Sequence, residues 1–186
     1  MVQHPTRTLV AYESLFGATR RIAEAVAAGI REGGADVDCR SVREVSASEI
    51  PGYGLLVLGA PTHSHTMPTA DSRAEGERWL EHRMRGSVLE PHATDPGMRE
   101  WIAAASFDGH RVAPFTTRVD LPRLIAGSAA SAIGRLARKR RGVVTAHGLE
   151  ALVDDRGSLL PGETDRARGW GIQLVVHAFD GAGARG

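Results

Sequence analysis

One stretch near the N-terminus constrains the fold more than any other, because it reads as a strand, a loop and a helix in direct succession. Residues 9–12 are apolar and have the length of a strand. A loop with small and hydroxyl-bearing residues follows at 14–19, and apolar residues then recur as on one face of a helix: Ile22, Ala23, Val26, Ala27 and Ile30. Such a loop presents unpaired backbone N–H groups, which together with the helix dipole favour an anion, typically a phosphate.

The side chains of this loop suit a phosphate monoester. Ser14 and Thr19 can donate hydrogen bonds from their hydroxyl groups, and Gly17 permits a turn that would strain a bulkier residue. The loop contains no lysine, so it is not the GxxxxGK[ST] motif that holds a nucleoside triphosphate. The alternative is an ordinary connection between a strand and a helix, capped by Ser14.

Strand and helix patterns alternate along the rest of the chain. Residues 53–61 are apolar almost without interruption, which indicates a strand buried on both faces, as in a parallel sheet covered by helices. The other patterns predict strands at 35–42, 111–115 and 143–146, the last with a continuation at 149–153, a loop at 116–120, and helices at 69–85, 98–107, 127–138 and 164–179. Pro114 should mark the end of its strand or a bulge. This order predicts an α/β fold, a doubly wound five-stranded parallel sheet with helices on both faces.

Length, charge and cysteine content narrow the class of protein. The 186 residues suit one domain over 1–186, with a core at about 7–180 and a mobile insertion at 66–97, of which residues 86–97 lack clear periodicity. The net charge of +1 argues against a nucleic-acid partner, and no apolar run approaches the roughly 20 residues that span a bilayer. Cys39 is the only cysteine, so an internal disulfide is excluded and a reducing, cytoplasmic location is expected.

The first loop, within Tyr12-Glu13-Ser14-Leu15-Phe16-Gly17-Ala18-Thr19, resembles the FMN phosphate loop of flavodoxins and flavodoxin-like proteins, which usually reads [ST]-x-[TF]-G-x-T. Residues 59–63, Gly-Ala-Pro-Thr-His, resemble the second loop of that family. Residues 115–118, Phe-Thr-Thr-Arg, resemble the third loop of a subset of flavodoxin-like proteins, in which an aspartate often precedes Thr-Arg. The resemblance implies the strand order 2-1-3-4-5 and FMN bound beyond the carboxyl ends of the strands.

The resemblance also implies which residues contact the cofactor. The first loop would hold the phosphate of FMN, and the second and third loops would lie on the two sides of its isoalloxazine ring. The FMN-binding residues expected on this basis are Ser14, Leu15, Phe16, Gly17, Ala18, Thr19, Pro61, Thr62, His63, Ser64, His65, Thr116, Thr117 and Arg118. Arg118 could pair with the electron-rich N1–O2 edge of a reduced flavin, or be a solvated surface arginine.

The chain departs from typical flavodoxins at the ring, which is usually stacked between Trp and Tyr side chains. Neither the second nor the third loop has an aromatic residue at its tip. His63 or His65 could stack more weakly, and Phe16 could pack against the ring from the phosphate side. A metal held by the two histidines and Asp71 would need better-defined ligand spacing, so we expect no metal.

Three functions remain open. An FMN-binding electron carrier needs a redox partner protein or a small-molecule electron acceptor. An NAD(P)H-dependent quinone or flavin reductase also needs room for both substrates over the ring, and residues 66–97 could then serve as a lid or as a contact in a homodimer. The third possibility, favoured by the absent aromatics, is a flavodoxin-fold scaffold without flavin. We expect a monomer or homodimer, assign no catalytic residue, and leave open whether the protein is an enzyme.

Overall fold

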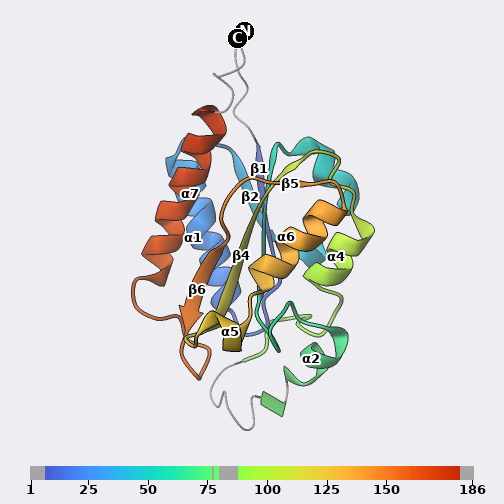
Figure 1. Ribbon diagram of the computed structural model, residues 1–186, viewed down its shortest axis with the longest axis vertical. Coiled ribbons are helices and arrows are strands. Elements are labelled where there is room, and N and C mark those ends of the chain that lie inside the picture. The colour runs from blue at the N-terminus through green and yellow to red at the C-terminus, as the bar shows by residue number, and fades with distance from the viewer. Residues whose placement is uncertain (1–6, 77, 80–87, 181–186) are drawn as a thin grey trace.

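The computed structural model describes residues 7–76, 78, 79 and 88–180 and contains one parallel sheet (Figure 1). The strand order is β2-β1-β3-β4-β5, which confirms the predicted order, and a sixth strand, β6, also pairs with β4. The strands are β1 (Thr8–Tyr12), β2 (Val37–Ser41), β3 (Leu55–Pro61), β4 (Arg111–Val119), β5 (Val143–Val144) and β6 (Leu149–Val153). β5 pairs with the start of β4, at Arg111 and Val112, and β6 pairs with its later part, from Phe115 to Val119. The two strands therefore share the fifth position of the sheet.

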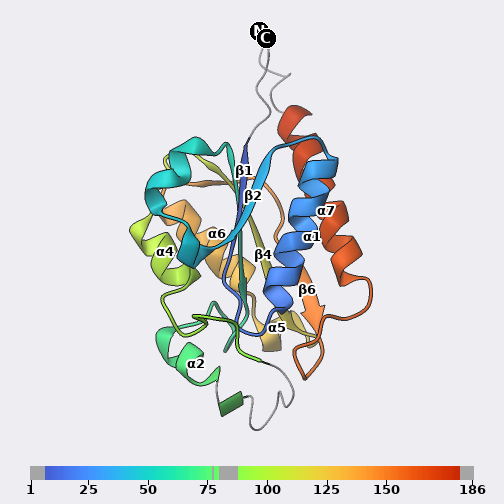
Figure 2. The ribbon, with the colours of Figure 1, turned by 180° about the vertical axis from the view of Figure 1, so that it is seen from behind.

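Helices cover both faces of this sheet, as the alternating pattern predicts. α1 (Ala18–Glu32) packs against α7 (Glu163–Asp180) on one face, whereas α4 (Met98–Ala104) and α6 (Ala129–Lys139) cover the other face (Figures 1 and 2). Two short helices, α2 (Ala70–Ala74) and α5 (Arg123–Ala126), lie near the carboxyl ends of the strands. Within the described residues, no helix is both long and apolar enough to span a membrane.

The two faces of the sheet form two separate cores, and the alternation of side chains along β1 shows the division. Leu9 and Ala11 join the core beneath α4 and α6, whereas Val10 joins the core beneath α1 and α7. In β3, Leu56 and Leu58 face the first core, and Val57 faces the second. All six side chains are fully buried, which confirms that these strands are covered on both sides.

Pro114 lies inside β4, so the expectation that it ends this strand is wrong. The N–H of Thr145 donates to the carbonyl of Val112 over 3.0 Å, which shows that Val112 faces the fifth position of the sheet. Alternate residues of a parallel strand face the same neighbour, so the nitrogen of Pro114 also faces that position. Proline has no N–H to donate, and residues 145–148 leave the sheet between β5 and β6 beside it. The interruption in pairing therefore lies in the neighbouring segment, between β5 and β6.

β4 continues through Thr116, Thr117 and Arg118 to Val119, so the loop predicted at 116–120 is wrong for these residues. The extension pairs with both neighbours, since Thr116 lies opposite Ala60 of β3 and opposite Glu150 of β6. The last part of β4 is therefore a central strand and not a loop.

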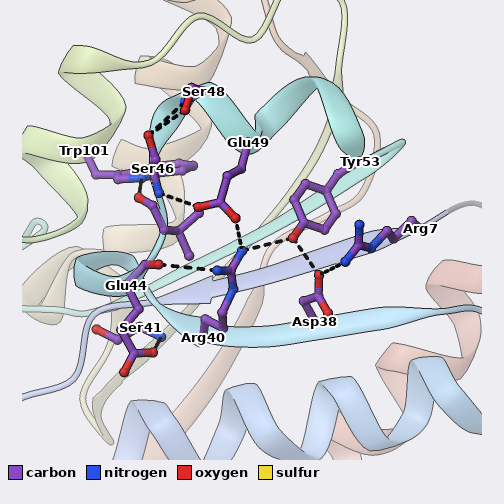
Figure 3. A network of polar contacts seen from close by, with 11 residues as sticks. Arg7, Asp38, Arg40, Ser41, Glu44, Ser46, Ser48, Glu49, Tyr53 and Trp101 are labelled. Atoms are coloured by element: carbon purple, nitrogen blue, oxygen red, sulfur yellow. Dashed lines mark hydrogen bonds and ion pairs between the residues drawn. The ribbon is translucent and has the colours of Figure 1, made fainter.

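A polar network fixes the edge strand β2 near its start (Figure 3). The Arg40 guanidinium donates to Glu49 over 2.7 Å and to the hydroxyl of Tyr53 over 3.0 Å. That hydroxyl donates to Asp38 over 2.6 Å, and Asp38 also accepts from Arg7 over 2.8 Å. The network ties β2 to the 3₁₀ helix at Ala47–Gly52.

Candidate functional site

A cavity of about 320 Å³ opens at the carboxyl ends of β1, β3, β4 and β6. The first loop, the end of β3, the end of β4 and the turn after β6 each form one wall. The lining residues are Leu15, Phe16, Ala18, Thr19, Pro61, Thr62, His63, Ser64, Trp79, Thr117, Arg118, Val119, Val153, Asp154, Asp155 and Gly157. The structure therefore brings the three predicted loops together, although Ser14, Gly17, His65 and Thr116 do not line the cavity.

The first loop makes a tight turn into α1. Gly17 has φ of 90°, which a side chain would strain, and its N–H donates to the hydroxyl of Ser14 over 3.1 Å. Gly17 occupies the N-cap position of α1, so the expectation that Ser14 is the capping residue is wrong. Thr19 follows in the first turn of α1, and its hydroxyl oxygen lies 2.7 Å from that of Thr117 at the end of β4. Two hydroxyl groups from separate elements thus meet at the cavity wall.

The second loop ends in a turn at residues 63–66, whose two central residues are not glycine. The N–H of His63 donates to the carbonyl of Thr66 over 2.7 Å, and the N–H of Thr66 donates back over 2.9 Å. Ser64 has φ of 44° and His65 has φ of 72°, which non-glycine residues seldom adopt. The carbonyl of His65 accepts the N–H of Ser128 over 3.3 Å, so α6 supports the turn from outside the cavity.

The imidazole of His63 is nearly buried and forms part of the cavity wall. Burial, with a smaller contribution from the Arg73 charge, lowers its pKa to about 4, so the ring is neutral at physiological pH. Within the described part of the chain, Nδ1 of His63 has no hydrogen-bond partner although it is shielded from solvent. The ring contacts Trp79 edge to face, with the two ring centroids 4.6 Å apart.

Trp79 is the residue that the loop motifs miss. The second and third loops indeed have no aromatic at their tips, but the segment after α2 places this indole in the cavity wall. The sequence signal is a tryptophan among the few apolar positions of the charged helical pattern at 69–85. Nothing in the local sequence shows which loop it will face, because that depends on how the segment folds back over β3.

The third predicted segment divides between the cavity and the interior. Thr117 lines the cavity, whereas Thr116 is fully buried and donates to the carbonyl of Ala60 over 2.7 Å. Arg118 is not a solvated surface arginine, because its guanidinium Nε pairs with Glu150 over 2.9 Å and its side chain is only 13% exposed. Nη1 of Arg118 also donates to the carbonyl of Leu121 over 2.7 Å, so much of the guanidinium is already used within the protein.

The fourth wall follows β6 and was not among the predicted site residues. Val153 ends β6, and Asp154, Asp155 and Gly157 form the next turn. The carboxylate of Asp154 accepts the N–H of Arg156 over 2.9 Å and that of Ser158 over 2.8 Å, which fixes the turn. The available signal was topological, since this turn follows the strand that lies beside β4 and so emerges at the same edge of the sheet.

A buried ionic cluster lies behind the first loop. Glu13 directly precedes Ser14 and is fully buried, and its carboxylate accepts the N–H of Met98 over 2.8 Å. Arg73 of α2 pairs with Glu13 over 3.4 Å and with Glu100 over 3.0 Å, and its side chain is 2% exposed. Burial raises the pKa of Glu13, while the Met98 N–H and Arg73 act in the opposite direction.

Part of the predicted insertion also touches the first loop. The N–H of Glu90 donates to the carbonyl of Leu15 over 2.7 Å, and the carboxylate of Glu90 accepts from Nε of Arg20 over 2.6 Å. Together with the Glu13–Arg73 pair, these contacts join Arg73 and Glu90, which lie on either side of residues 80–87 in the sequence, to the first loop and its flanking elements. Mobility of residues 66–97 stays a prediction, and part of that range lies outside the described residues.

Comparison with known proteins agrees with this geometry. Residues 10–115 match the family model named Flavodoxin. A relative from Archaeoglobus fulgidus named NAD(P)H dehydrogenase (quinone) is 31% identical over an alignment of 110 residues, and the match covers 44% of this chain and 58% of that protein. Flavodoxin 1 from Bacillus cereus is 17% identical with a TM-score of 0.65, covering 92% of this chain and 99% of its own. An archaeal flavodoxin is 19% identical with a TM-score of 0.63, covering 92% and 97%. At these identities the solved structures show a shared fold alone.

Proposed function

Because the chain belongs to the flavodoxin family, we propose that it binds FMN non-covalently in this cavity and takes part in electron transfer. FMN supplies the redox chemistry when bound, since its ring accepts and donates one or two electrons. The observation that carries the proposal is the pair of hydroxyl groups of Thr19 and Thr117, 2.7 Å apart at the N-terminus of α1 and at the cavity wall. Hydroxyl donors at a helix N-terminus suit a phosphate monoester.

In this proposal the first loop binds the phosphate and the other walls orient the ring. Thr19 donates a hydrogen bond from its hydroxyl group to a phosphate oxygen and accepts one from the hydroxyl of Thr117. The hydrogen bond between the two threonines is therefore kept with and without FMN. Phe16, Pro61 and Trp79 supply apolar contact area near the ring. The volume of about 320 Å³ is at the lower end of small-molecule sites.

The fourth wall, after β6, should also affect the reduction potential of the bound cofactor. Asp154 and Asp155 line the cavity, and the Arg118 charge is already paired with Glu150. Negative charge near the ring disfavours the addition of an electron, so these residues should lower the reduction potential of the bound cofactor. A low potential suits donation to a redox partner protein or a small-molecule acceptor.

A titration of the purified protein with FMN, followed by tryptophan fluorescence, tests the proposal. Trp79 lines the cavity and Trp170 does not, so FMN should quench the wild type and Trp170→Phe strongly and Trp79→Phe markedly less. The Trp79→Phe variant keeps an aromatic ring beside His63 and should still bind FMN, as measured by the fluorescence of the flavin itself. Absence of saturable quenching in the wild type would instead favour the scaffold without flavin.

A reductase is the second candidate, and the Archaeoglobus fulgidus relative is the observation that favours it. Its name refers to an NAD(P)H dehydrogenase that acts on quinone, but the match spans only 58% of its length. Steady-state oxidation of NAD(P)H in the presence of FMN and a soluble quinone separates the two functions. Turnover well above that of free FMN at equal concentration supports the reductase, and turnover equal to it supports the electron carrier.

We also propose that the protein is cytoplasmic and is a monomer or a homodimer.

A further inference from the structure

The turn that carries His63 is held on several sides despite its unfavourable backbone. Positive φ at two consecutive non-glycine residues, Ser64 and His65, is a strained backbone conformation that persists only where the surroundings hold it. The N–H of Thr62 donates to the carbonyl of Thr117 over 2.8 Å, and the hydroxyl of Thr62 accepts the N–H of Ala129 over 3.0 Å. Bonds to β4 and to α6 therefore fix the turn, and a turn held in this way positions the side chain it carries.

The protein also fixes the protonation state of that side chain. The charged group that faces the imidazole is the guanidinium of Arg73 on α2, itself nearly buried, and the other ring contact is the uncharged indole of Trp79. A cation beside a buried imidazole opposes its protonation. The single proton of the neutral ring belongs on Nε2, because a buried N–H at Nδ1 would have no acceptor, which is less favourable than a buried lone pair there.

We propose that His63 is a fixed, uncharged Nε2–H donor that recognises a carbonyl oxygen on the ring of the bound flavin. The inference rests on the proposed binding of FMN and specifies the chemistry of the ring end of the site. A carbonyl is the acceptor that fits, because the donor carries no charge and Arg118, the nearby lining cation, is paired with Glu150. A phosphate or carboxylate would require a charged partner at this wall.

Two properties follow from a neutral donor. His63 neither gains nor loses a proton between pH 5.5 and 8, so the hydrogen bond should contribute equally across about that range. A ring carbonyl becomes more negative when the flavin is reduced, so the bond should strengthen on reduction. His63 is therefore a positioning and specificity residue that favours the reduced ring, and it does not act as a proton donor.

The state of the imidazole can be measured without flavin, by NMR of the FMN-free protein with ¹⁵N-labelled histidine. His63→Asn identifies the resonances of His63 by their loss. We expect a protonated Nε2, an unprotonated Nδ1 and no titration between pH 5.5 and 8. Protonation at Nδ1, or titration near the ordinary pKa of histidine, overturns the inference and leaves the binding of FMN unaffected.

The function of the donor is tested by the affinity for oxidised and reduced FMN. His63→Phe keeps a ring against Trp79 but removes the donor, and should raise the Kd for oxidised FMN about 3- to 10-fold, with a larger factor for reduced FMN. His63→Asn keeps an N–H and should recover part of the loss. If the wild type binds FMN and both variants match it, the inference is wrong while the proposed function stands. If the wild type does not bind FMN, both are wrong.

Discussion

The hydroxyl oxygens of Thr19 and Thr117 lie 2.7 Å apart and join the first turn of α1 to the end of β4. Both side chains are nearly buried, so this contact is shielded from competing water. A hydroxyl can donate one hydrogen bond and accept others, which means that either threonine can redirect its proton without losing the contact. The pair therefore links the phosphate end of the proposed site to the strand that forms its ring end.

Replacing Thr19 with valine should weaken the binding of FMN much more than that of riboflavin, because the hydroxyl is assigned to the phosphate. A hydrogen bond to a charged group contributes about 1.5–3 kcal/mol, so we expect an increase of roughly 10- to 150-fold in the Kd for FMN. The Kd for riboflavin, which has no phosphate, should change less than about 3-fold. Flavin fluorescence in parallel titrations measures both constants.

Thr117→Val is the matched control for that prediction. It removes the same contact from the opposite side, but leaves the Thr19 hydroxyl free to donate to the phosphate. We therefore expect a smaller loss of FMN affinity than in Thr19→Val. Equal losses for FMN and riboflavin in Thr19→Val would contradict the assignment of this hydroxyl to the phosphate.

The sequence predicts the first half of the fold well, for identifiable reasons. The uninterrupted apolar run of β3 and the helical spacing of Ile22 and Val26 in α1 are local patterns that only one arrangement can bury. β4 is different, because Pro114 normally argues against a central strand. Its missing donor is tolerated only because residues 145–148 leave the sheet beside it, and that compensation lies in another segment.

The residues of the candidate site also divide into those that local sequence predicts and those that depend on tertiary contacts. Residues that follow directly from a strand end, such as Thr19 and His63, can be assigned from order and spacing alone. Trp79 and Asp154 reach the cavity through turns whose directions depend on tertiary contacts. Arg118 illustrates a third case, since its position was predicted but its ion pair with Glu150 could not be.

The buried pair of Glu13 and Arg73 should be important for stability. Glu13→Ala leaves Arg73 with Glu100 alone and removes the acceptor of the Met98 N–H. Breaking a buried ion pair costs about 3–5 kcal/mol, and urea denaturation should show a loss of that size in the free energy of unfolding. As a control, Glu24→Ala removes one partner of Arg20 at the surface, where both side chains are about half exposed, and should change stability by less than about 1 kcal/mol. Similar losses in the two variants would contradict a structural role for the buried pair.

His63 should make the protein less stable in acid. The pKa of its imidazole is lowered from 6.5 to about 4 in the folded protein, so between these values the unfolded chain binds a proton that the folded chain does not. Stability is therefore lost as the pH falls below about 6.5, and the loss from this group levels off near pH 4 at up to about 3 kcal/mol. Urea denaturation at a series of pH values should show a shallower acid loss in His63→Phe than in the wild type. Parallel pH profiles would show that His63 titrates normally in the folded state.

Gly59 and Phe115 lie opposite each other on β3 and β4, and the phenyl ring covers the glycine. A Cβ atom on Gly59 would lie 2.0 Å from Cζ of Phe115, whose side chain is fully buried. Gly59→Ala should therefore destabilise the protein by about 1–3 kcal/mol or more, because the ring has little room to move.

Phe115→Leu should itself be destabilising, yet the double variant should lose less than the sum of the two single losses, since leucine vacates the space that alanine needs. Gly52→Ala is the control, because nothing lies within 4 Å of the added atom there. Thermal unfolding of the four variants measures the coupling, and strictly additive losses would show that the contact between these two residues does not set the requirement for glycine.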